Sequence, residues 1–567
     1  MKIIRSCFIK GNRAILIFLL LAGQQSVVNA QQLDSLKSKK PFSIHGNAGI
    51  NFIGYNVSGI QERMAPFTMM LSAHAVASVY GISIPFSFRY SGKKADYLQP
   101  FNQFGLSPQY KWVTLHGGYR NVHFSNFTLA GHTFLGAGVE LNPGKFRFGY
   151  VYGRFRDNND NVAFGADTLR NYTRRGFAMR IGTGSDKNFV DFILMRIQDD
   201  STSLDQPLRP FSSMAEQNGI IGINSRVSFS RNLFLESEVA ASFFTTDMSA
   251  PGFESMKEVP GWTSIDGLMV INQSSELLSA VRSSLNYRKK STAVRLEYRR
   301  IDPGYRSMGA YFFNNDVEQI TLAPSFMMLK RKLHVRGSIG IQQDNLSKSK
   351  GATTTRAISS FGVSYNPLPI FGIDLNYSNY SNNQRPGRLP LIDSLKQFHT
   401  TANLSIMPRL IIVREKFQHM IMLVFNRMEL NDKNAHTALY TENRALTWQV
   451  NYHLNISKPG ITCMAGLNHN RLQNYAAEYK ATGITVGITK AFFEGKLSTG
   501  WNNVLLNTNT AMQKGWVYNS TVNALYQYNH HHTLRFNFYI INATYKDEAA
   551  TPSFHEIKGD FGYAYTF

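Results

Sequence analysis

The chain has 567 residues and a formal net charge of +23, with 43% hydrophobic, 13% aromatic and 17% charged residues. No run after residue 22 approaches the roughly 18 uninterrupted apolar residues of a transmembrane helix, which excludes a helical membrane protein. Two cysteines exclude a scaffold held by several disulfides. A net positive charge of this size often indicates nucleic-acid binding in a cytosolic protein. Because the first residues of this chain indicate export, we expect no nucleic-acid partner.

Residues 1–30 have the parts of a secretory signal peptide. The basic region contains Lys2, Arg5, Lys10 and Arg13. An apolar run over residues 14–22 and the small-residue pattern ending at Ala30 follow. Because the apolar run is about half of the roughly 20 residues that span a bilayer, we expect cleavage after Ala30. Residues 31–41 would then be a short periplasmic segment before a barrel over residues 42–567, with no room for a separate plug domain.

Stretches of alternating apolar and polar residues fill the rest of the chain. Successive side chains of a strand point to opposite faces, so each stretch has one apolar and one polar face. The polar faces carry Arg147, Arg295, Arg299, Arg336 and Arg535. Alternation alone does not separate a soluble sandwich from a membrane barrel, because both have one apolar and one wet face.

Short turns and longer polar loops connect these stretches in alternation. Short turns include residues 142–145, 230–232, 330–332 and 493–496, and long loops include 156–172, 199–218, 246–275 and 302–316. Bacterial outer-membrane barrels have short periplasmic turns and longer outer loops. The pattern predicts an all-β fold, a large antiparallel up-and-down barrel of about 26 strands (range 22 to 26). An even count places both termini in the periplasm.

The last eight residues alternate strictly between aromatic and small side chains. The aromatic face carries Phe561, Tyr563, Tyr565 and Phe567. Such an edge invites aggregation unless it is paired or immersed in lipid. Together with the signal peptide, this stretch resembles the closing strand of Gram-negative outer-membrane β-barrel proteins. The resemblance implies contacts with outer-membrane lipid and lipopolysaccharide, and an assembly signal in these four residues for the barrel-assembly machinery.

Within that class, the chain is similar to plug-less porins or exporters. TonB-dependent receptors carry a plug domain before the barrel, for which residues 31–41 are too short. Large lipopolysaccharide-inserting barrels carry a periplasmic domain and paired cysteines, which this sequence lacks. The resemblance covers the pattern from Phe42 onwards and, as a motif, only the last strand.

Charge and chain length suggest what such a barrel would conduct. An arginine that faces lipid at mid-depth costs roughly 2 to 4 kcal/mol, so the five wall arginines named above are expected to face the lumen. Basic rings favour anions. Basic turn residues such as Lys330 to Lys332 are expected instead at the membrane surface.

A wide lumen also needs a constriction. The first candidate is the loop of residues 246–275, because its apolar side chains are hard to reconcile with free solvent. The candidate constriction residues are Phe253, Trp262, Leu268 and Met269. The alternative is an outward loop that docks on a partner protein. Residues 121–131 and 302–316 are second candidates for inward folding.

The sequence therefore predicts an outer-membrane channel or gated conduit for an anionic or polar solute, without cofactor or covalent chemistry. The alternative is a partner-binding or structural barrel of a secretion, adhesion or glycan-uptake assembly. An outer-membrane lipid hydrolase is the weakest interpretation. Its serine and histidine neighbours, such as Ser72 with His74 and Ser125 with His123, arise easily by chance. His530 to His532 suit a polar turn better than a metal site.

Overall fold

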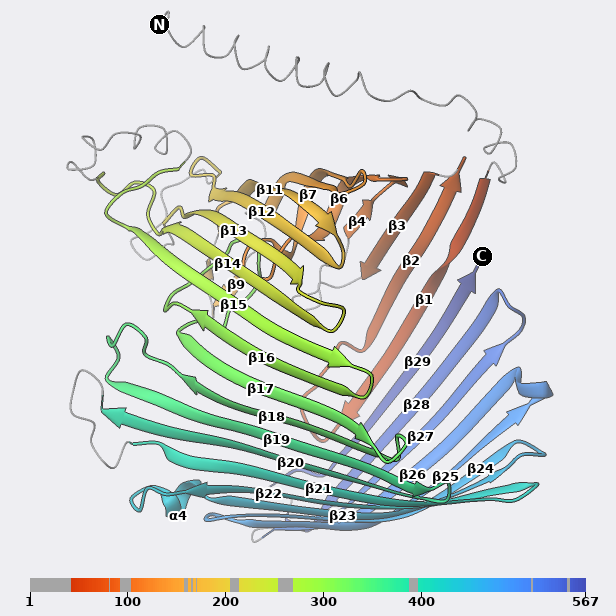
Figure 1. Ribbon diagram of the computed structural model, residues 1–567. Coiled ribbons are helices and arrows are strands. Elements are labelled where there is room, and N and C mark those ends of the chain that lie inside the picture. Colours follow the sequence, from red (N-terminus) through yellow and green to blue (C-terminus); the bar gives the residue numbers. More distant parts are fainter. Residues whose placement is uncertain are drawn as a thin grey trace, which may run out of the picture.

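The strands, each with alternating apolar and polar residues, pair into one continuous wall (Figure 1). A computed structural model describes residues 42–80, 82–91, 103–157, 162–164, 167–169, 171–203, 214–252, 269–386, 396–510, 513–547 and 551–567. The predicted signal peptide, its cleavage site and residues 31–41 lie outside these ranges. No helix in the described part of the chain is long and apolar enough to cross a bilayer.

The strands follow the period-two segments of the sequence. The first half comprises β1 (Phe42–Ser58), β2 (Phe67–Val79), β3 (Ile82–Ser91), β4 (Gln103–Leu106), β5 (Gln109–Tyr110), β6 (Val113–His123), β7 (Ala130–Leu141), β8 (Phe146–Arg156), β9 (Val162–Phe164), β10 (Asp167–Leu169), β11 (Arg174–Ser185), β12 (Asn188–Asp199), β13 (Gln217–Ser228), β14 (Leu233–Thr245), β15 (Ser275–Lys289) and β16 (Thr292–Ile301). The second half comprises β17 (Val317–Met328), β18 (Leu333–Gln343), β19 (Ala352–Leu368), β20 (Phe371–Pro386), β21 (Phe398–Val413), β22 (Phe417–Asp432), α4 (Ala438–Thr441), β23 (Asn443–Ile456), β24 (Ile461–Asn474), β25 (Glu478–Phe492), the 3₁₀ turn η4 (Phe493–Gly495), β26 (Leu497–Thr510), β27 (Lys514–Gln527), β28 (His532–Tyr545) and β29 (Phe554–Thr566).

The wall is closed, because the last strand pairs with the first. The antiparallel register of β1 and β29 runs from Asn47 opposite Thr566 to Ser58 opposite His555, and Figure 1 shows the two strands side by side. The short strands β4 and β5 together occupy one wall position between β3 and β6. The result is a closed antiparallel barrel of 26 strands, which confirms the predicted fold class. Among the described residues, β9 and β10 form a separate two-stranded sheet.

The two faces of the wall differ in exposure. On β12, Val190 and Phe192 are 47% and 45% exposed, whereas Asp191 and Ile193 between them are 1% and 0% exposed. Large apolar side chains are exposed at alternating positions along most wall strands. Such a band around a closed wall is stable against lipid and would aggregate in water. The outer face of the wall is therefore the lipid-facing one.

The two rims of the barrel also differ. One rim carries short turns, such as the turn after Leu141 in which Gly144 has a positive φ of 62°. Aromatic side chains cluster beside these turns and include Trp112, Phe146, Phe229, Phe417, Phe493 and Tyr528. The other rim carries the longer loops. An aromatic belt at one rim is the expected anchor at a membrane interface, and the ends of β1 and β29 nearest the chain termini lie at this short-turn rim.

A hydrophobic core fills one side of the lumen. Its members come from the inner faces of β6 to β17 and from two loops at the long-loop rim, residues 124–129 and 302–316, which fold into the barrel and are called here the inward loops. The core contains Val122, Phe124, Phe127, Leu129, Phe134, Val151, Phe155, Ala178, Ile193, Met195, Ile197, Ile220, Ala240, Phe244, Ala280, Ile301, Tyr305, Met308 and Val317. The core therefore occupies the side of the lumen lined by β6 to β17 and contains no residue of β18 to β29 or β1 to β3.

Candidate functional site

The two inward loops form one unit. The hydroxyl of Tyr305 donates to the carbonyl of Phe127 at 2.6 Å, and the hydroxyl of Ser307 donates to the carbonyl of Thr128 at 2.6 Å. The rings of Phe127 and Tyr305 meet edge to face at 6.1 Å. Burial, reinforced by the nearby carboxylate of Glu238, raises the pKa of the Tyr305 hydroxyl far above its ordinary value. That hydroxyl therefore stays protonated and remains a donor.

A buried carboxylate on the wall holds the first inward loop in place. Glu238 of β14 points inward and is 6% exposed. It accepts hydrogen bonds from the amide of Phe127 and the side chain of Asn126, both at 2.8 Å. The side-chain oxygen of Asn218 accepts a bond from the amide of Met308 at 3.0 Å. Each loop is thus fixed to the inner wall by its own backbone.

We expect Glu238→Ala to release the first inward loop. The substitution leaves the buried amide of Phe127 without an acceptor, at a cost of about 1 to 3 kcal/mol, and it also removes the bond from the exposed side chain of Asn126. Single-channel recordings should show larger current fluctuations than the native protein. The matched control is Glu236→Ala on the same inner face, where the carboxylate is half-exposed and lies 3.5 Å from Arg226. Equal noise in both variants would contradict the anchoring role.

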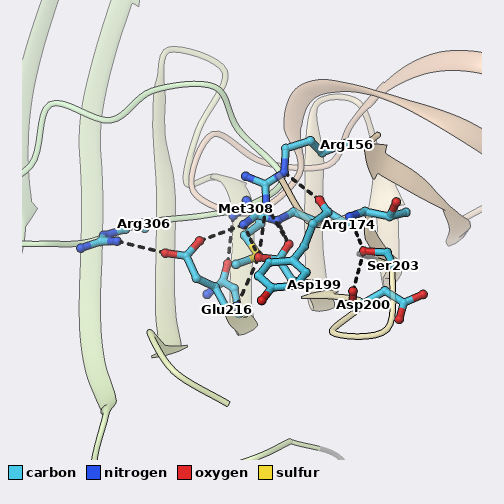
Figure 2. A network of polar contacts seen from close by, with 11 residues as sticks. Arg156, Arg174, Asp199, Asp200, Ser203, Glu216, Arg306 and Met308 are labelled. Atoms are coloured by element: carbon cyan, nitrogen blue, oxygen red, sulfur yellow. Dashed lines mark hydrogen bonds and ion pairs between the residues drawn. The ribbon is translucent and has the colours of Figure 1, made fainter. Parts of the chain in front are cut away.

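A polar pocket lies at the long-loop mouth, beside the inward loops. Figure 2 shows Arg156 and Arg174 pointing toward Asp199, with distances of 3.1 Å and 2.7 Å to its carboxylate. Arg174 also reaches Glu216 at 2.8 Å, and Arg306 of the second inward loop approaches Glu216 at 3.8 Å. Three arginines therefore face two carboxylates. The cavity has a volume of about 480 Å³.

A β-bulge places Arg156 in this pocket. The register of β8 against β11 shifts where Arg174 lies opposite Arg156 and Arg175 lies opposite Arg154. The extra residue, Phe155, packs inward on Phe134 with ring centroids 5.3 Å apart. Phe155 has the inward parity of Val151 and Gly153, and the bulge turns Arg156 toward the lumen beside it, as bulges commonly re-aim a side chain at the rims of barrels.

Aromatic rings form the second side of the pocket. The ring of Tyr311 stacks on His132 at 4.3 Å, and its hydroxyl oxygen accepts a hydrogen bond from the amide of Thr133 at 3.0 Å. The guanidinium of Arg306 lies 4.8 Å from the ring centre of Phe244. Phe312 is 82% exposed at the mouth. A solute entering here meets flat apolar surfaces beside cationic groups.

The structure places the five predicted wall arginines on the face opposite the exposed apolar side chains. Arg147 donates to Asp191 at 2.8 Å and 3.0 Å, and its guanidinium lies 4.5 Å from the ring centre of Phe189. Arg295 is paired with Glu297. These two arginines are neutralised by carboxylates on the inner face.

The other three have weaker partners. Arg336 donates to the side-chain oxygen of Asn376 at 3.2 Å, and Arg535 lies 3.8 Å from Asp560. Arg299 has a buried Nε with no hydrogen-bond partner among the described residues. Their influence on a passing ion stays a prediction.

Of the predicted constriction residues, Phe253, Trp262 and Leu268 lie outside the described residues. Met269 lies against Gly219 of β13, where an added Cβ would come within 2.1 Å of its sulfur. Gly219 shares a face with Ile221, which is exposed on the outside of the wall. This end of the loop therefore lies over the outer side, and its constricting role stays a prediction. The loops that the structure shows folding inward, residues 124–129 and 302–316, lie within the second candidates, residues 121–131 and 302–316.

The predicted assembly residues lie on the closing strand. Phe561, Tyr563 and Tyr565 share the outer face of β29, opposite Phe52, Ile50 and Ala48 of β1. Phe567 exchanges two backbone hydrogen bonds of 2.9 Å with Gly46. The residues therefore lie along the seam that closes the barrel, and their role as a signal stays a prediction.

One polar series escaped the sequence pattern. The hydroxyl of Ser107 lies 2.8 Å from Nδ1 of His116, whose Nε2 lies 3.0 Å from Glu140. Arg180 donates to the same carboxylate at 2.9 Å. The serine is 4% exposed, so a substrate does not reach its hydroxyl in this conformation, and we interpret the series as fastening the wall. No group of three or more metal-ligating side chains occurs within the described ranges.

No family model and no curated protein sequence matches the chain. Among solved structures, the siderophore receptor PirA from Pseudomonas aeruginosa shares 9% identity and a TM-score of 0.36, with 93% of this chain and 81% of that chain covered. Pseudomonas aeruginosa OpdK with vanillate shares 10% identity and a TM-score of 0.31, with 62% of this chain and 93% of that chain covered. Acinetobacter baumannii OccAB4 shares 9% identity and a TM-score of 0.29, with 93% of this chain and 98% of that chain covered. These TM-scores are too low to carry an argument, so class and function rest on the chain's own geometry.

The closed wall and the distribution of side chains on its two faces are characteristic of one class of membrane protein. The wall is closed without a free edge, its outer face is apolar, and its inner face carries arginine, carboxylate and amide side chains. Antiparallel barrels with this distribution span the outer membrane of Gram-negative bacteria. The chain is an outer-membrane β-barrel protein of the Gram-negative type.

Proposed function

We propose that the protein is a conduit for small anionic solutes across the outer membrane, narrowed by the two inward loops. In this proposal the short-turn rim, where β1 begins and β29 ends, faces the periplasm, and the long loops face the exterior. The observation that carries the proposal is the contrast inside the barrel. The core and inward loops fill one side of the lumen, while the inner face of the opposite side bears exposed polar groups such as Arg336 and Arg535.

The charge of that inner surface favours anions. Within the described residues, no carboxylate lies at ion-pair distance from Arg89, Arg120, Arg299 or Arg336. Each of these side chains stands on a polar face of the wall, where the guanidinium remains charged and is solvated by water or by a passing anion. Such groups lower the barrier for an anion and raise it for a cation.

The mouth pocket narrows the class of solute. Its volume of about 480 Å³ is within the range of small-molecule sites. Arg306 supplies a guanidinium that can bind a carboxylate through two parallel hydrogen bonds, and Phe312 and Tyr311 supply flat rings for stacking. We propose small aromatic or other planar carboxylates as preferred solutes.

The reversal potential in a salt gradient tests the proposal. The native barrel in a planar bilayer should prefer chloride over potassium. Arg299→Gln with Arg336→Gln should lower the anion-to-cation permeability ratio at least about twofold, because each removes a lumen charge without leaving an unpaired carboxylate. The matched control, Arg299→Lys with Arg336→Lys, keeps the charge and should keep the ratio.

Two results would reject this function. A native barrel that prefers cations would refute the anion pathway. A folded barrel without any conductance would favour the partner-binding alternative, in which the core closes the lumen and the surface loops bind another protein.

A further inference from the structure

A second cavity lies inside the barrel at the seam where the wall closes. It has a volume of about 660 Å³ and lies over five neighbouring strands, β28, β29, β1, β2 and β3, which run side by side in Figure 1. Asn47 of β1 and Thr533 of β28 line it near the short-turn ends of these strands. The cavity is therefore separate from the mouth pocket, which lies at the long-loop rim.

Two exposed arginines line this cavity from opposite sides. Arg535 of β28 lies opposite Gly562 of β29, and Arg89 of β3 lies opposite Ser72 of β2, all on the inner face of the wall. The two strands are four spacings apart, which is roughly 19 Å between their backbones. The side chain of Arg535 covers part of this distance, because its guanidinium donates to the side-chain oxygen of Asn51 at 3.4 Å. One small ligand can therefore contact both arginines.

The cavity contains cationic groups without acidic ones. Among the described residues that line it, none is an aspartate or a glutamate, and His74 lies beside the two arginines. In the described part of the chain, no carboxylate is at ion-pair distance from Arg89. Arg535 has one, Asp560, which lies 3.8 Å away, beyond hydrogen-bond distance, and does not line the cavity. Both guanidinium groups therefore keep donors free for an anion.

The surface between the arginines suits a short chain. Gly49 and Ala564 leave room over β1 and β29, and the hydroxyl of Ser72 is exposed beside them. Met70 and Leu525 also line the cavity, so methylene groups have apolar side chains to pack against. A ligand with an acidic group at each end of a short carbon chain fits this arrangement.

We propose that this cavity binds a small dicarboxylate, with one carboxylate on Arg535 and the other on Arg89. A guanidinium matches a carboxylate through two parallel hydrogen bonds. A monocarboxylate of the same length contacts only one of the two arginines, so the cavity distinguishes the two kinds of acid. The inference rests on the proposed function, because the solute reaches the cavity through the lumen, and it names the class of solute that this second site selects.

Isothermal titration calorimetry of the purified full-length barrel in detergent tests the site. The probes are adipate, a dicarboxylate, and hexanoate, the monocarboxylate of the same length. The native protein should bind adipate at least about tenfold more tightly than hexanoate, because hexanoate lacks the second charged contact. Arg89→Gln with Arg535→Gln should lower the affinity for adipate to about that for hexanoate.

Two further variants separate the cavity from the general charge of the barrel. Arg288→Gln with Lys289→Gln removes the same charge at the short-turn end of β15, away from the cavity, and should bind adipate as the native protein does. Ser72→Leu keeps both arginines but fills the space between them, and should lower the affinity for adipate at least about tenfold. Heat-modifiable gel mobility verifies that each variant is folded.

Equal affinity of the native barrel for adipate and hexanoate overturns the proposal, as does undiminished adipate binding by the double arginine variant. Displacement of adipate by equimolar inorganic phosphate would show a site for compact anions and would also overturn it. Bilayer recordings separate this site from the proposed function. A barrel that binds adipate but conducts no anions refutes the conduit and leaves the site, whereas a barrel that conducts anions without binding adipate refutes the site alone.

Discussion

Replacing residues 303–315 by a two-glycine link is expected to raise single-channel conductance at least about twofold, since a wide barrel conducts according to the loops that fill it. The link is sterically simple, because the amide of Asp316 lies 3.4 Å from the carbonyl of Asp302. The deletion removes Tyr305 and Ser307, whose hydroxyls hold the first inward loop. Both loops should therefore withdraw from the lumen.

A loop on the opposite side of the barrel provides the control. Replacing residues 434–441, which include the short helix α4, by the same link removes a long-rim loop that does not belong to the core. Its conductance should stay near the native value. If neither deletion changes conductance, the inward loops do not limit the pathway.

Removing Phe567 is expected to cause the largest loss of folded protein in the outer membrane, about tenfold, because it weakens the last contact of the closing seam. Its amide and carbonyl both bond to Gly46, and its ring contacts Tyr565 at a centroid distance of 5.8 Å. Molecules that do assemble should conduct normally, since the residue lies at the rim. Quantitative immunoblots of outer-membrane fractions measure the level, and bilayer recordings measure the conductance.

The matched control for that deletion is Phe493→Ala, which removes an exposed aromatic ring from another short turn at the same rim. It should assemble near the native level if the closing strand is what the assembly machinery recognises. Native amounts of the Phe567 deletion would exclude the proposed signal, and an equal loss in both proteins would indicate a general need for rim aromatics.

The wall itself could be predicted from the sequence because alternate residues of a membrane-spanning strand face the lipid and the lumen, so the strand has a period-two pattern of apolar and polar side chains. Arg147 and Arg295 lie opposite apolar side chains in the sequence and also in the barrel. Loop length likewise predicted the rims. These features depend on residues a few positions apart, for which period and spacing are sufficient.

The functional interior depends on contacts that no local pattern contains. The hydrogen bond from Tyr305 to Phe127 joins residues 178 positions apart, so the sequence could name both loops but could not pair them. Arg156 is four residues after the lipid-facing Tyr152, so regular alternation would place both on the outer face, and only the bulge turns Arg156 inward. Conversely, the rule that wall arginines face the lumen holds at mid-depth, and it does not apply to Arg175 and Arg196 near the rim, whose neighbours Arg174 and Ile197 face inward.

The one-sided core gives the barrel an uneven stiffness. Where β12 to β16 contact packed side chains of the core, bending the wall would compress close contacts, whereas no described residue of β20 to β28 belongs to that core. Thermal breathing should therefore concentrate in the unsupported arc, and its backbone amides should exchange with deuterium faster. The cross-section of the pathway then has a rigid side, formed by the core, and a deformable side, formed by the strands without core contacts. A bulky solute would pass by displacing the deformable side.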